Sequence, residues 1–590
     1  MVHDGSKTPD SGMVHENELE KSPAAVGDSL PEESQNAVAS HTDDSPDPSA
    51  LQISLIFIAL ALSIFLIGLD GTIVGTAIPS ITQEFKQLND VGWYGSAYLV
   101  TTCGMQLFYG RLYTIFPVKI CFLSSIFIFE IGSLVCAVAP NSAAFIIGRA
   151  IAGLGSGGVI SGVFIIQSYA IPLRFRPTTG GLLGAMEGIA MAVAPLISGA
   201  LTQHVTWRWC FYINLPLGGF SLAVITLLFR NPKNQELVPM SFREKLLSMD
   251  LLGLFLFVPS VVCLLLALQW GGTTYAWGNA RIIILLILAA ALFSSFVFVQ
   301  RYKRTNVTLP IRVLKQRSVI VSIAYAFFMG GSIFLVEYYV RVPLSFLLTG
   351  MKSLNKAFSQ LPLWFQSIKN ASPAHSGIML LPILIALVLT GVTTGFIVTA
   401  LGYYAPFMIA GSVCISIAAG LMTTFKAATG QGSWIGYQVL FGIGVGMGFQ
   451  QSFLAVQTVL PQKDIPIGTT AVIFANNLGG AVFVSVANNL FTNELSKSLR
   501  QRLPALDPAA ILGAGATGWR SKVSDAILSE VLTAYNTAIT RTFFCPMALG
   551  CAAVVAAVFV EWKSVKGKGA QEEKGGSPSV GSAEGEKIGD

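Results

Sequence analysis

The sequence predicts an all-helical protein that crosses a lipid bilayer many times, on three observations. Hydrophobic residues make up 53% of the 590-residue chain and charged residues only 12%, about half the share of a soluble domain. Of the 31 acidic residues, 11 precede residue 51 and 6 follow residue 560. Between these ends, apolar runs of about 20 residues recur, each long enough to cross the hydrocarbon core. This pattern excludes a soluble enzyme, a coiled coil and a nucleic-acid binder.

The two ends of the chain are predicted to be disordered cytoplasmic tails. Residues 1–50 are rich in Ser, Pro, Asp and Glu without an apolar period, and such a composition cannot build a core. They also lack the basic-then-apolar order of a signal peptide. Residues 562–590 repeat Lys, Gly, Glu and Ser, so we expect a second loose tail.

Fourteen membrane spans are predicted from the apolar runs. They lie near 51–69, 91–110, 118–138, 142–162, 180–200, 209–229, 250–268, 282–300, 318–339, 376–396, 403–423, 433–453, 468–490 and 543–561. An even number places both tails on one side of the membrane. The loops on that side carry basic residues such as Arg111, Arg174, Arg230 and Lys463, and basic loops stay in the cytoplasm.

An internal repeat predicts two six-helix halves. Gly153-Leu-Gly155-Ser-Gly157 reappears 289 residues later as Gly442-Ile-Gly444-Val-Gly446, and Pro172 and Pro177 reappear in the same register as Pro461 and Pro466. Parallel repeats of this kind build many transporters. The halves are expected at 51–230 and 318–561, with two linking helices and their cytoplasmic loops at 231–317.

Three runs carry a resemblance to a known family. LDGTIVGTAIP closes span 1 at 69–79, GRAIAGLG lies in span 4 at 148–155, and WRWCFYINLP enters span 6 at 207–216, with Gly132-Ser133 and Asn141 in order between them. They resemble the signature of the fourteen-span drug:proton antiporter branch of the major facilitator superfamily, and about residues 50–560 are similar to fungal toxin and drug efflux pumps. The resemblance implies the major facilitator fold and a monomeric pump that exports a small organic molecule in exchange for protons.

The chain departs from the family pattern in two places. In the loop after span 2, Thr114 stands where the family has an acid, which puts that loop's role in conformational change in doubt. In span 5, Ala194 and Ser198 stand where the antiporter motif has glycine, beside Pro195 and Gly199. A stripe of small residues still runs along this span, formed by Gly180, Gly184, Gly188 and Ala192. It predicts either ordinary close packing or a contact that rocks between the halves.

Acidic residues inside apolar spans are the sharpest candidates for function, because a buried carboxylate normally faces a cavity or a partner. Asp70 lies at the outer end of the first run, so it has either an interfacial structural role or a role in proton coupling or helix gating. Glu187, in mid-span, contacts a proton or a cationic substrate or pairs with a neighbour. Glu130 is expected to be structural, and Glu337 and Asp250 are further candidates.

Arg149 is the basic residue inside a span of the first half. Arginine keeps its proton, so it must pair with an acid or line water. The resemblance implies a role in proton coupling for it. Its repeat partner is Gln438, so the charge is expected in one half only.

A mixture of aromatic and amide side chains predicts a substrate cavity. Its candidate residues are Tyr98, Gln106, Asn476 and Asn477, a combination that suits large, mostly apolar ligands with a few hydrogen-bonding groups. Two weak glycosylation sequons begin at Asn370 and Asn306. Residues 340–360 interrupt the family pattern after span 9 and are either an unspliced intron in the gene sequence or a real external loop.

Two other functions remain open on the sequence alone. One is an importer of an iron chelate or another small solute, and the other is a membrane receptor or sensor, which would not need repeated halves. Scattered His and Cys residues and the absence of a phosphate-binding loop motif predict no cofactor, no metal and no enzyme. The plasma membrane is the expected location, with the vacuole as the alternative.

Overall fold

The computed structural model describes residues 50–87, 90–231, 241–272, 275–303, 307–337, 360–371, 373–504, 506–512, 519–520 and 523–566. The chain separates into two compact units, Met1–Ser49 and Ala50–Asp590, and the second holds every described residue. Nearly all of the predicted tails and of the 340–360 segment lies outside these ranges. The described elements are helices, with two isolated bridges in addition, which confirms the predicted fold class.

The first half consists of helices that follow one another with short connections. They are α1 (Ala50–Phe85), α2 (Val91–Ile115), α3 (Val118–Val138), α4 (Ser142–Ala170), α5 (Arg176–His204), α6 (Trp209–Tyr212) and α7 (Asn214–Leu228). Asn141 begins α4 as an N-cap, because its side chain accepts a hydrogen bond from the Ala144 amide at 2.9 Å. A 3-10 turn, Leu173–Phe175, leads into α5.

Linking helices and the second half follow. The linking region holds α8 (Phe242–Ser248), α9 (Leu251–Trp270), α10 (Ala280–Tyr302) and α11 (Ile311–Leu314). The second half holds α12 (Arg317–Glu337), α14 (Gln360–Ser367), α15 (Pro373–Ile378), α16 (Leu381–Leu401), α17 (Ala405–Met422), α18 (Gln431–Gly448), α19 (Gln451–Val459), α20 (Ile465–Arg502), α21 (Pro508–Leu512), α23 (Asp525–Thr542) and α24 (Phe544–Val558).

Thirteen helical segments within the described ranges are long and apolar enough to cross a membrane, and each corresponds to a predicted span. The predicted second span, α2, is not among them. Its 25 residues reach about 37 Å, enough to cross, but polar residues lower its mean hydropathy. These residues face other helices: the Thr102 hydroxyl, for example, donates to the Gly153 carbonyl at 2.9 Å.

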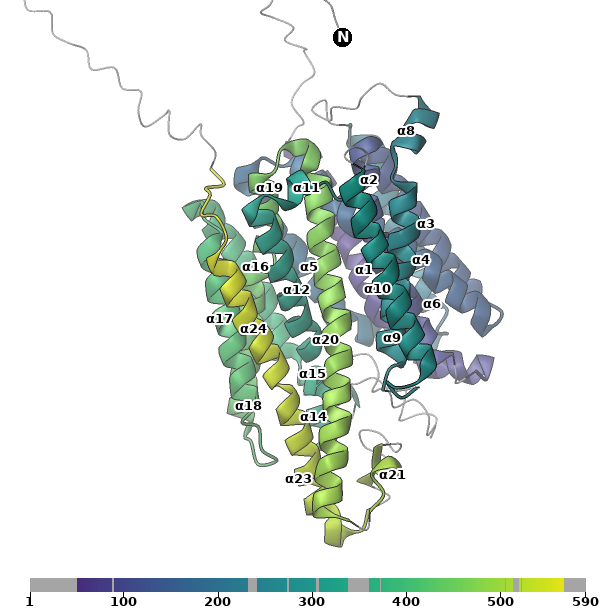
Figure 1. Ribbon diagram of the computed structural model, residues 1–590, viewed down its shortest axis with the longest axis vertical. Helices are drawn as coiled ribbons and strands as arrows, with labels where there is room; N and C mark the ends of the chain where they lie inside the picture. The colour runs from purple at the N-terminus through teal and green to yellow at the C-terminus, as the bar shows by residue number, and fades with distance from the viewer. Residues whose placement is uncertain are drawn as a thin grey trace, which may run out of the picture. The chain divides into compact units, whose positions relative to one another are not determined.

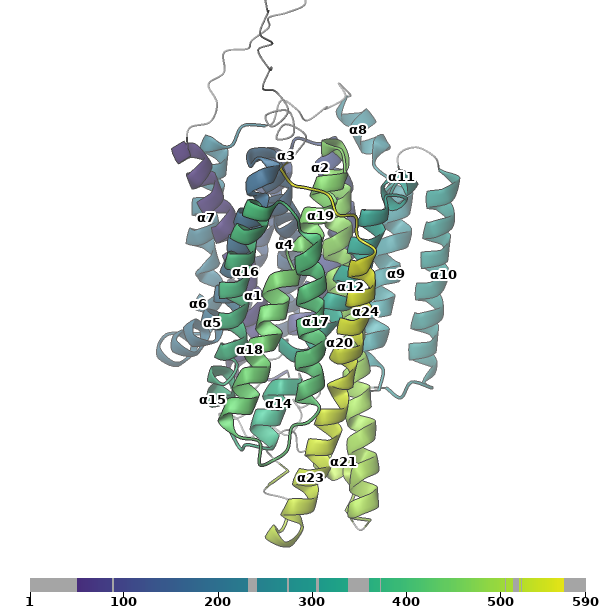
Figure 2. The same ribbon diagram turned by 90° about the vertical axis from the view of Figure 1, so that its left-hand side faces the viewer.

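The first residues of α1 and the last residues of α24 lie at the same end of the bundle, as Figures 1 and 2 show. We call this end the tail side and the opposite end the far side. The last part of α20 and the short α21 extend on the far side, where Leu499 and Trp519 are buried with Tyr535 of α23. These residues fall between the predicted spans at 468–490 and 543–561, because such amphipathic packing leaves no long apolar run.

The two halves repeat the same packing. α1 packs on α5 as α12 packs on α20, and α2 packs on α4 as α16 packs on α18. The 3-10 turn Leu173–Phe175 before α5 has its counterpart in Gln462–Asp464 before α20, 289 residues later. The repeat read from the sequence is therefore also a repeat of secondary structure and of helix contacts.

The halves meet along two seams, α5 with α16 and α2 with α20. On the tail side, each seam closes on a glycine. A Cβ on Gly395 would lie 2.6 Å from the carbonyl oxygen of Pro177, and one on Gly110 would lie 3.3 Å from that of Pro466. Pro177 and Pro466 are the matching prolines of the repeat, so both seams are built alike.

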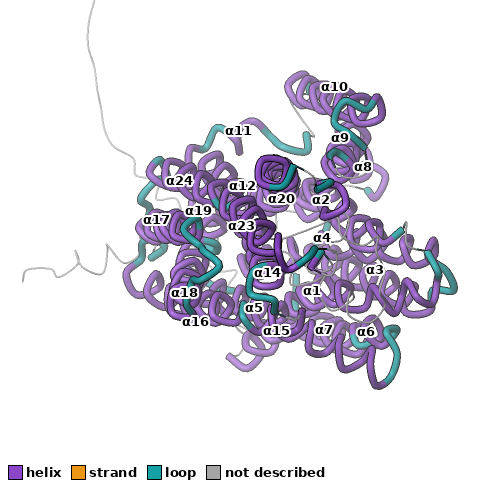
Figure 3. The backbone as a smooth tube through the Cα atoms, turned by 90° about the horizontal axis from the view of Figure 1, so that it is seen from below, coloured by secondary structure: helices purple, strands orange, loops and turns teal. Residues whose placement is uncertain are grey.

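The linking helices lie beside one of these seams. Figure 3 shows α9 and α10 outside the halves, with α9 next to α2 and α10 on its outer side, and α9 contacts both α2 and α20. Phe257 of α9 packs on Phe474 of α20 with ring centroids 5.2 Å apart. On the far side, Gln269 of α9 donates to the Gly92 carbonyl of α2 at 3.3 Å. The linking helix α9 therefore contacts both halves.

Candidate functional site

A buried ion pair joins the first and fourth spans of the first half. Arg149 Nη1 donates to Asp70 Oδ2 at 2.7 Å, and the two side chains are 1% and 0% exposed. α1 continues past Asp70 as far as Phe85, so this residue lies inside the helix and not at its end. Buried charges are stable only when paired, and each of these two is paired with the other.

Polar groups from three further helices complete this ion-pair cluster. Asn214 Nδ2 of α7 donates to Asp70 Oδ1 at 3.2 Å and to Ser133 Oγ of α3 at 3.1 Å. Arg149 Nε donates to the carbonyl oxygen of Tyr94 in α2 at 3.0 Å. The three sequence runs at 69–79, 148–155 and 207–216 therefore meet at one point, which explains why they occur together.

Tyr98, predicted to line a substrate cavity, belongs to the same cluster. Its ring centroid lies 4.4 Å from the guanidinium carbon of Arg149, within the range of a cation–π contact. The side chain is 5% exposed. The structure thus places Tyr98 where it supports the arginine.

The second half keeps the geometry of the arginine but not its charge. Gln438 Nε2 of α18 donates to the carbonyl oxygen of Met379 at 3.0 Å, as Arg149 does to that of Tyr94. Gln438 lies 289 residues after Arg149, in the register of the repeat. A neutral amide therefore occupies the position of the guanidinium.

Glu187 and Asn476 also occupy matching positions of the repeat. A Cβ on Gly68 of α1 would lie 3.5 Å from the carbonyl oxygen of Glu187, and one on Gly330 of α12 would meet that of Asn476. The two side chains stand 289 residues apart on α5 and α20. Where the first half has a carboxylate, the second half has an amide.

When α1 is aligned with α12 in this way, Ser332 occupies the position that matches Asp70. Asp70 follows Gly68 by two residues, and Ser332 follows Gly330 by two residues. Ser332 is fully buried, and its hydroxyl donates to the Pro546 carbonyl at 3.2 Å. Each of the three ionisable side chains predicted to act in proton coupling therefore has a neutral counterpart. The pairs are Asp70 with Ser332, Arg149 with Gln438, and Glu187 with Asn476.

Glu187 lies on the side of α5 that faces the interface between the halves. Gly188 contacts α16 and Ala190 contacts α1, while Ile189 is 40% exposed on the opposite side. With 3.6 residues per turn, Glu187 projects between the two contact lines. Its side chain is half-buried, and its carboxylate forms no hydrogen bond or ion pair with a described residue, so no described neighbour pairs with it.

The other predicted cavity residues divide between two environments. Gln106 is fully buried in the contact of α2 with α4, where its Nε2 donates to Ser161 Oγ at 2.5 Å. Asn476 is 8% exposed and donates to the Ala326 carbonyl at 3.4 Å. Asn477 is half-buried on α20. The structure thus brings the two asparagines together on α20 and places Gln106 inside the first half.

The small-residue stripe of α5 contacts the second half. A Cβ on Gly184 would lie 2.6 Å from Gln450 Nε2, and one on Gly188 would lie 2.9 Å from Val388. Pro195 lies inside α5, and Gly199 is half-buried one turn later. The stripe is therefore an interhelical contact between the halves.

Ser198, which replaces a motif glycine, ties α5 to α1. Its side chain is fully buried, and its hydroxyl donates to the Ile73 carbonyl at 3.1 Å. The other replacement, Ala194, is also fully buried in the α1–α5 packing. Because these residues fill the contact, they fasten α5 to its own half.

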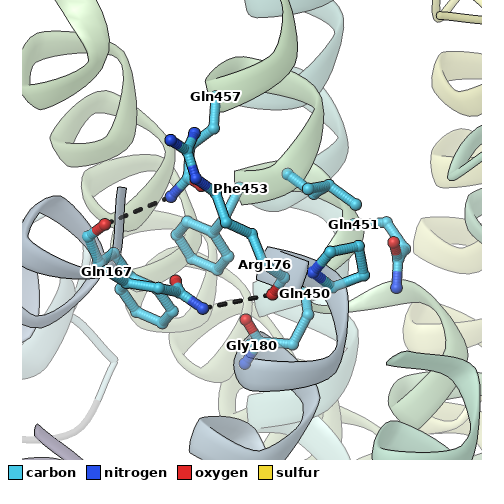
Figure 4. Close-up of a pocket in the computed structure, with 10 residues that line it drawn as sticks. Gln167, Arg176, Gly180, Gln450, Gln451, Phe453 and Gln457 are labelled. Carbon is cyan, nitrogen blue, oxygen red and sulfur yellow. Dashed lines mark hydrogen bonds between the residues drawn. The ribbon is translucent and has the colours of Figure 1, made fainter. Parts of the chain in front are cut away.

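Side chains from both halves close the tail side of the interface (Figure 4). Phe164 of α4 stacks on Phe453 of α19 with ring centroids 4.6 Å apart. Gln457 Nε2 donates to the Phe164 carbonyl at 3.4 Å. The hydroxyls of Thr178 and Thr399 lie 2.8 Å apart across the α5–α16 seam. In this conformation the halves are joined on the tail side.

A small pocket remains within this closed region. It has room for about one water molecule and cannot hold an organic substrate. Sequence reasoning missed it, although its glutamines are unusual in apolar spans. Its lining consists of Phe164, Gln167, Arg176, Pro177, Gly180, Gln450, Gln451, Phe453, Leu454 and Gln457.

The remaining motif residues at the far end of the first half form a second ionic contact. Trp207 Nε1 and Arg208 Nη2 donate to the two carboxylate oxygens of Glu84 at 2.6 and 2.7 Å. Arg208 also donates to the Ala137 carbonyl at 2.8 Å. This contact fixes the end of α1 to the loop before α6, so these motif residues have a structural role here.

Asp250 organises the tail-side end of the linking helices. Its carboxylate accepts hydrogen bonds from the Gly253 amide at 3.0 Å, from Gln300 Nε2 and from the Thr308 hydroxyl at 3.0 Å, and Lys303 Nζ lies 3.5 Å away. Burial acts to raise the pKa of Asp250, but these hydrogen bonds and the lysine outweigh it and hold the pKa below its usual value.

Replacing Asp250 with asparagine should lower the free energy of unfolding by about 1–3 kcal/mol, because an amide would face donors with its own NH2 group. The carboxyl's pKa is lower in the folded protein, so its stabilising contribution is complete above the unfolded-state value of about 3.9 and is lost as pH falls through the folded-state value. Thermal unfolding should separate wild type from Asp250→Asn at neutral pH and bring them together in acid. A separation that does not change with pH would contradict this account, and Glu530→Gln on the exposed surface serves as the control.

Four residues that the sequence analysis singled out remain to be placed. The Glu337 side chain and Asn306 lie outside the described residues, and Asn370 is exposed between α14 and α15. Thr114 donates to the Gly110 carbonyl of its own helix at 2.8 Å. Among the residues that the structure describes, no group of three His, Cys, Asp or Glu side chains could hold a metal ion.

Comparison with known proteins identifies related sequences over most of the chain. The sequence model described as Major Facilitator Superfamily matches residues 60–484. The chain is 45% identical over 541 residues to the MFS-type efflux pump MFS1 of Trichophyton rubrum, covering 92% of this chain and 97% of that one. It is 46% identical over 519 residues to the efflux pump aflT of Aspergillus parasiticus, covering 88% and 97%.

Solved structures of other transporters share the fold. The human organic anion transporter MFSD10 aligns with a TM-score of 0.51 at 13% identity, covering 84% of this chain and 98% of that one. The proton:xylose symporter XylE aligns with a TM-score of 0.54 at 14% identity, covering 88% and 99%. At these identities the likeness concerns the fold alone.

Proposed function

Because this chain belongs to the major facilitator superfamily, we propose that it is an efflux transporter that exports a small organic molecule in exchange for protons. The substrate class is a secondary metabolite, toxin or drug. Export is supported by the likeness of most of the chain to fungal efflux pumps. A transporter of this superfamily carries its substrate without chemical change, so the chain is not an enzyme.

Proton coupling rests on one observation, the carboxylate of Glu187 at the interface between the halves. A carboxylate at membrane depth normally pairs with a cation or faces a cavity, and this one has no described partner. It lies on the helix whose glycines contact the second half. Binding or release of a proton at Glu187 changes the charge at the contact between α5 and the second half. The two halves must move relative to each other at this contact during transport.

Alternating access provides the mechanism. The two halves rock about a site between them, and Phe164, Phe453 and the Thr178–Thr399 contact hold the tail side shut. We place the tail side in the cytoplasm, since its loops are basic, and the protein in the plasma membrane as a monomer. In this arrangement substrate leaves on the far side and protons enter there.

The first test is the efflux of a dye from cells. A fungal host that expresses the chain is loaded with rhodamine 6G, an apolar organic cation, and dye release is followed with and without a protonophore. Expression should accelerate release, and the protonophore should remove the acceleration. Release that is equal with and without expression, for this dye and for a panel of fungal secondary metabolites, would overturn the proposal.

Glu187→Gln should separate transport from the pH gradient, because glutamine keeps the size of the side chain but cannot exchange a proton. In vesicles with an imposed gradient, one coupled proton can sustain about a ten-fold concentration ratio of dye per pH unit. We expect the wild type to approach this ratio and the variant to remain near one. Glu530→Gln, on the exposed surface, is the matched control. A Glu187→Gln variant that still concentrates the dye would show that another residue binds the coupled proton.

A further inference from the structure

Glu130, in the middle of α3, is a second buried carboxyl next to the ion-pair cluster. Its side chain is 7% exposed, and neither carboxyl oxygen forms a hydrogen bond with a described residue. Asp70, by contrast, binds both Arg149 and Asn214. A carboxylate that is buried without a cation or a donor is costly, so this environment favours the neutral, protonated form of Glu130.

The helix opposite provides a fitted space for this carboxyl. Gly218 lies on α7 against Glu130, and a Cβ at this position would overlap Glu130 Oε1. At the next residue, Gly219, a Cβ would meet nothing within 4 Å. The absent side chain at Gly218 therefore makes room for the carboxyl group.

The position of Glu130 places it one turn from the ion pair. Ser133, three residues further along α3, is bonded to Asn214, and Gly218 follows Asn214 by four residues on α7. Neighbours at these spacings share one helix face. The carboxyl thus lies on the same α3–α7 contact that holds Asp70.

Few charged groups surround Glu130. Asp70 of α1 interacts with it electrostatically, and Arg149 of α4 is bound to Asp70. α7 contains no titratable residue, and the remaining titratable residues of the helices packed on α3 are cysteines and tyrosines, apart from Arg111 at the end of α2. One cation therefore serves two carboxyl groups, so only one of them can be ionised without an unpaired charge.

We propose that Glu130 is the proton-carrying partner of the Asp70–Arg149 pair, an inference that rests on the proposed exchange of substrate for protons. When α3 and α7 separate, the O–H bond of the Glu130 carboxyl breaks and the proton passes to water. The new carboxylate then competes with Asp70 for the Arg149 guanidinium. Because Asp70, Glu130 and Arg149 stand on α1, α3 and α4, this exchange of partners couples the proton to helix movement.

Infrared spectroscopy of the purified full chain tests the protonation directly and needs no substrate. A protonated carboxylic acid has a C=O stretching band that is distinct from the bands of a carboxylate. Wild type should show this band at neutral pH and lose it in alkali. Glu130→Gln should show a weaker band, because the contribution of Glu130 is absent while that of Glu187 remains, and Glu530→Gln should match the wild type. A spectrum unchanged by Glu130→Gln at every pH would overturn the inference.

Transport assays separate a proton carrier from a structural residue. With rhodamine 6G in vesicles, Glu130→Gln should lose accumulation driven by a pH gradient but keep dye–dye exchange, which needs no net proton movement. Loss of both activities, or retention of both, would overturn the inference. If the wild type itself showed no gradient-driven accumulation, the proposed function would fail while the infrared result would still report on Glu130.

The two neighbouring glycines provide a matched pair of variants. Gly218→Ala places a methyl group against the Glu130 carboxyl and should shift the pH at which the infrared band titrates. Gly219→Ala adds the same methyl group in open space and should leave that pH unchanged. An equal response of the two variants would contradict the fitted contact.

Discussion

Replacing Arg149 with glutamine should abolish export and lower the free energy of unfolding by about 3–5 kcal/mol. The loss follows from the Asp70 carboxylate, which would remain buried without the guanidinium now 2.7 Å from it. The neutral side chain also ends any exchange of partners between the carboxyl groups. Rhodamine 6G efflux measures the first effect, and thermal unfolding of the purified variant measures the second.

The second half of the protein suggests the control for this variant. Asp70→Ser combined with Arg149→Gln installs the residues found at the matching positions, Ser332 and Gln438. Because both charges leave together, no unpaired ion remains, and removing a buried pair as a unit is far less costly than breaking it. We expect the double variant to regain most of its unfolding temperature and to remain inactive.

Two outcomes would contradict this account. A normally folded Arg149→Gln protein that still exports the dye would show that the permanent charge is dispensable for transport. A double variant as unstable as the single one would attribute the lost stability to packing instead of to an unpaired charge.

Replacing Gly395 with valine should stop transport while each half remains folded. The added Cβ would lie 2.6 Å from the Pro177 carbonyl oxygen, a backbone atom that cannot turn aside. Overpacking of this kind costs about 1–3 kcal/mol, and here the cost falls on the contact between the halves. The tail side should therefore open and fail to close again.

A disulfide test measures that closure. Cysteines introduced at Thr178 and Thr399, whose hydroxyls lie 2.8 Å apart, should form a cross-link readily in the wild-type background and poorly with Gly395→Val. Gly436→Val adds the same side chain where a Cβ meets nothing within 4 Å and should leave transport and cross-linking intact. Equal cross-linking with and without Gly395→Val would show that the seam accommodates the valine.

The sequence predicts the helices and the repeat because both depend on local or periodic patterns. Each apolar run long enough to cross a bilayer corresponds to a helix, and the 289-residue register extends to the turns before α5 and α20. α2 was also predicted as a span, although its mean hydropathy is lower than that of the other spans. Its polar side chains form hydrogen bonds with other helices. Mean hydropathy does not count these bonds, so hydropathy alone does not identify α2 as a membrane-spanning helix.

The assembly of the site could not be predicted in the same way. Asp70 and Arg149 stood out separately, since each is an ion in an apolar run, but their pairing depends on how α1 and α4 are placed. Gln106 matched a cavity residue by type, yet its amide bonds to Ser161 inside the first half. Residue type indicates that a polar partner is needed, and only the packing of helices identifies it.

The neutral counterparts in the second half have a consequence for the membrane voltage. An electric potential across a bilayer acts on net charge, and the Asp70–Arg149 pair has none. Among the matched residues described above and Glu130, net charge arises when Glu187 or Glu130 loses its proton, whereas Ser332, Gln438 and Asn476 cannot ionise. Voltage and acidity therefore act on the same two carboxyl groups, and both of these groups belong to the first half of the protein.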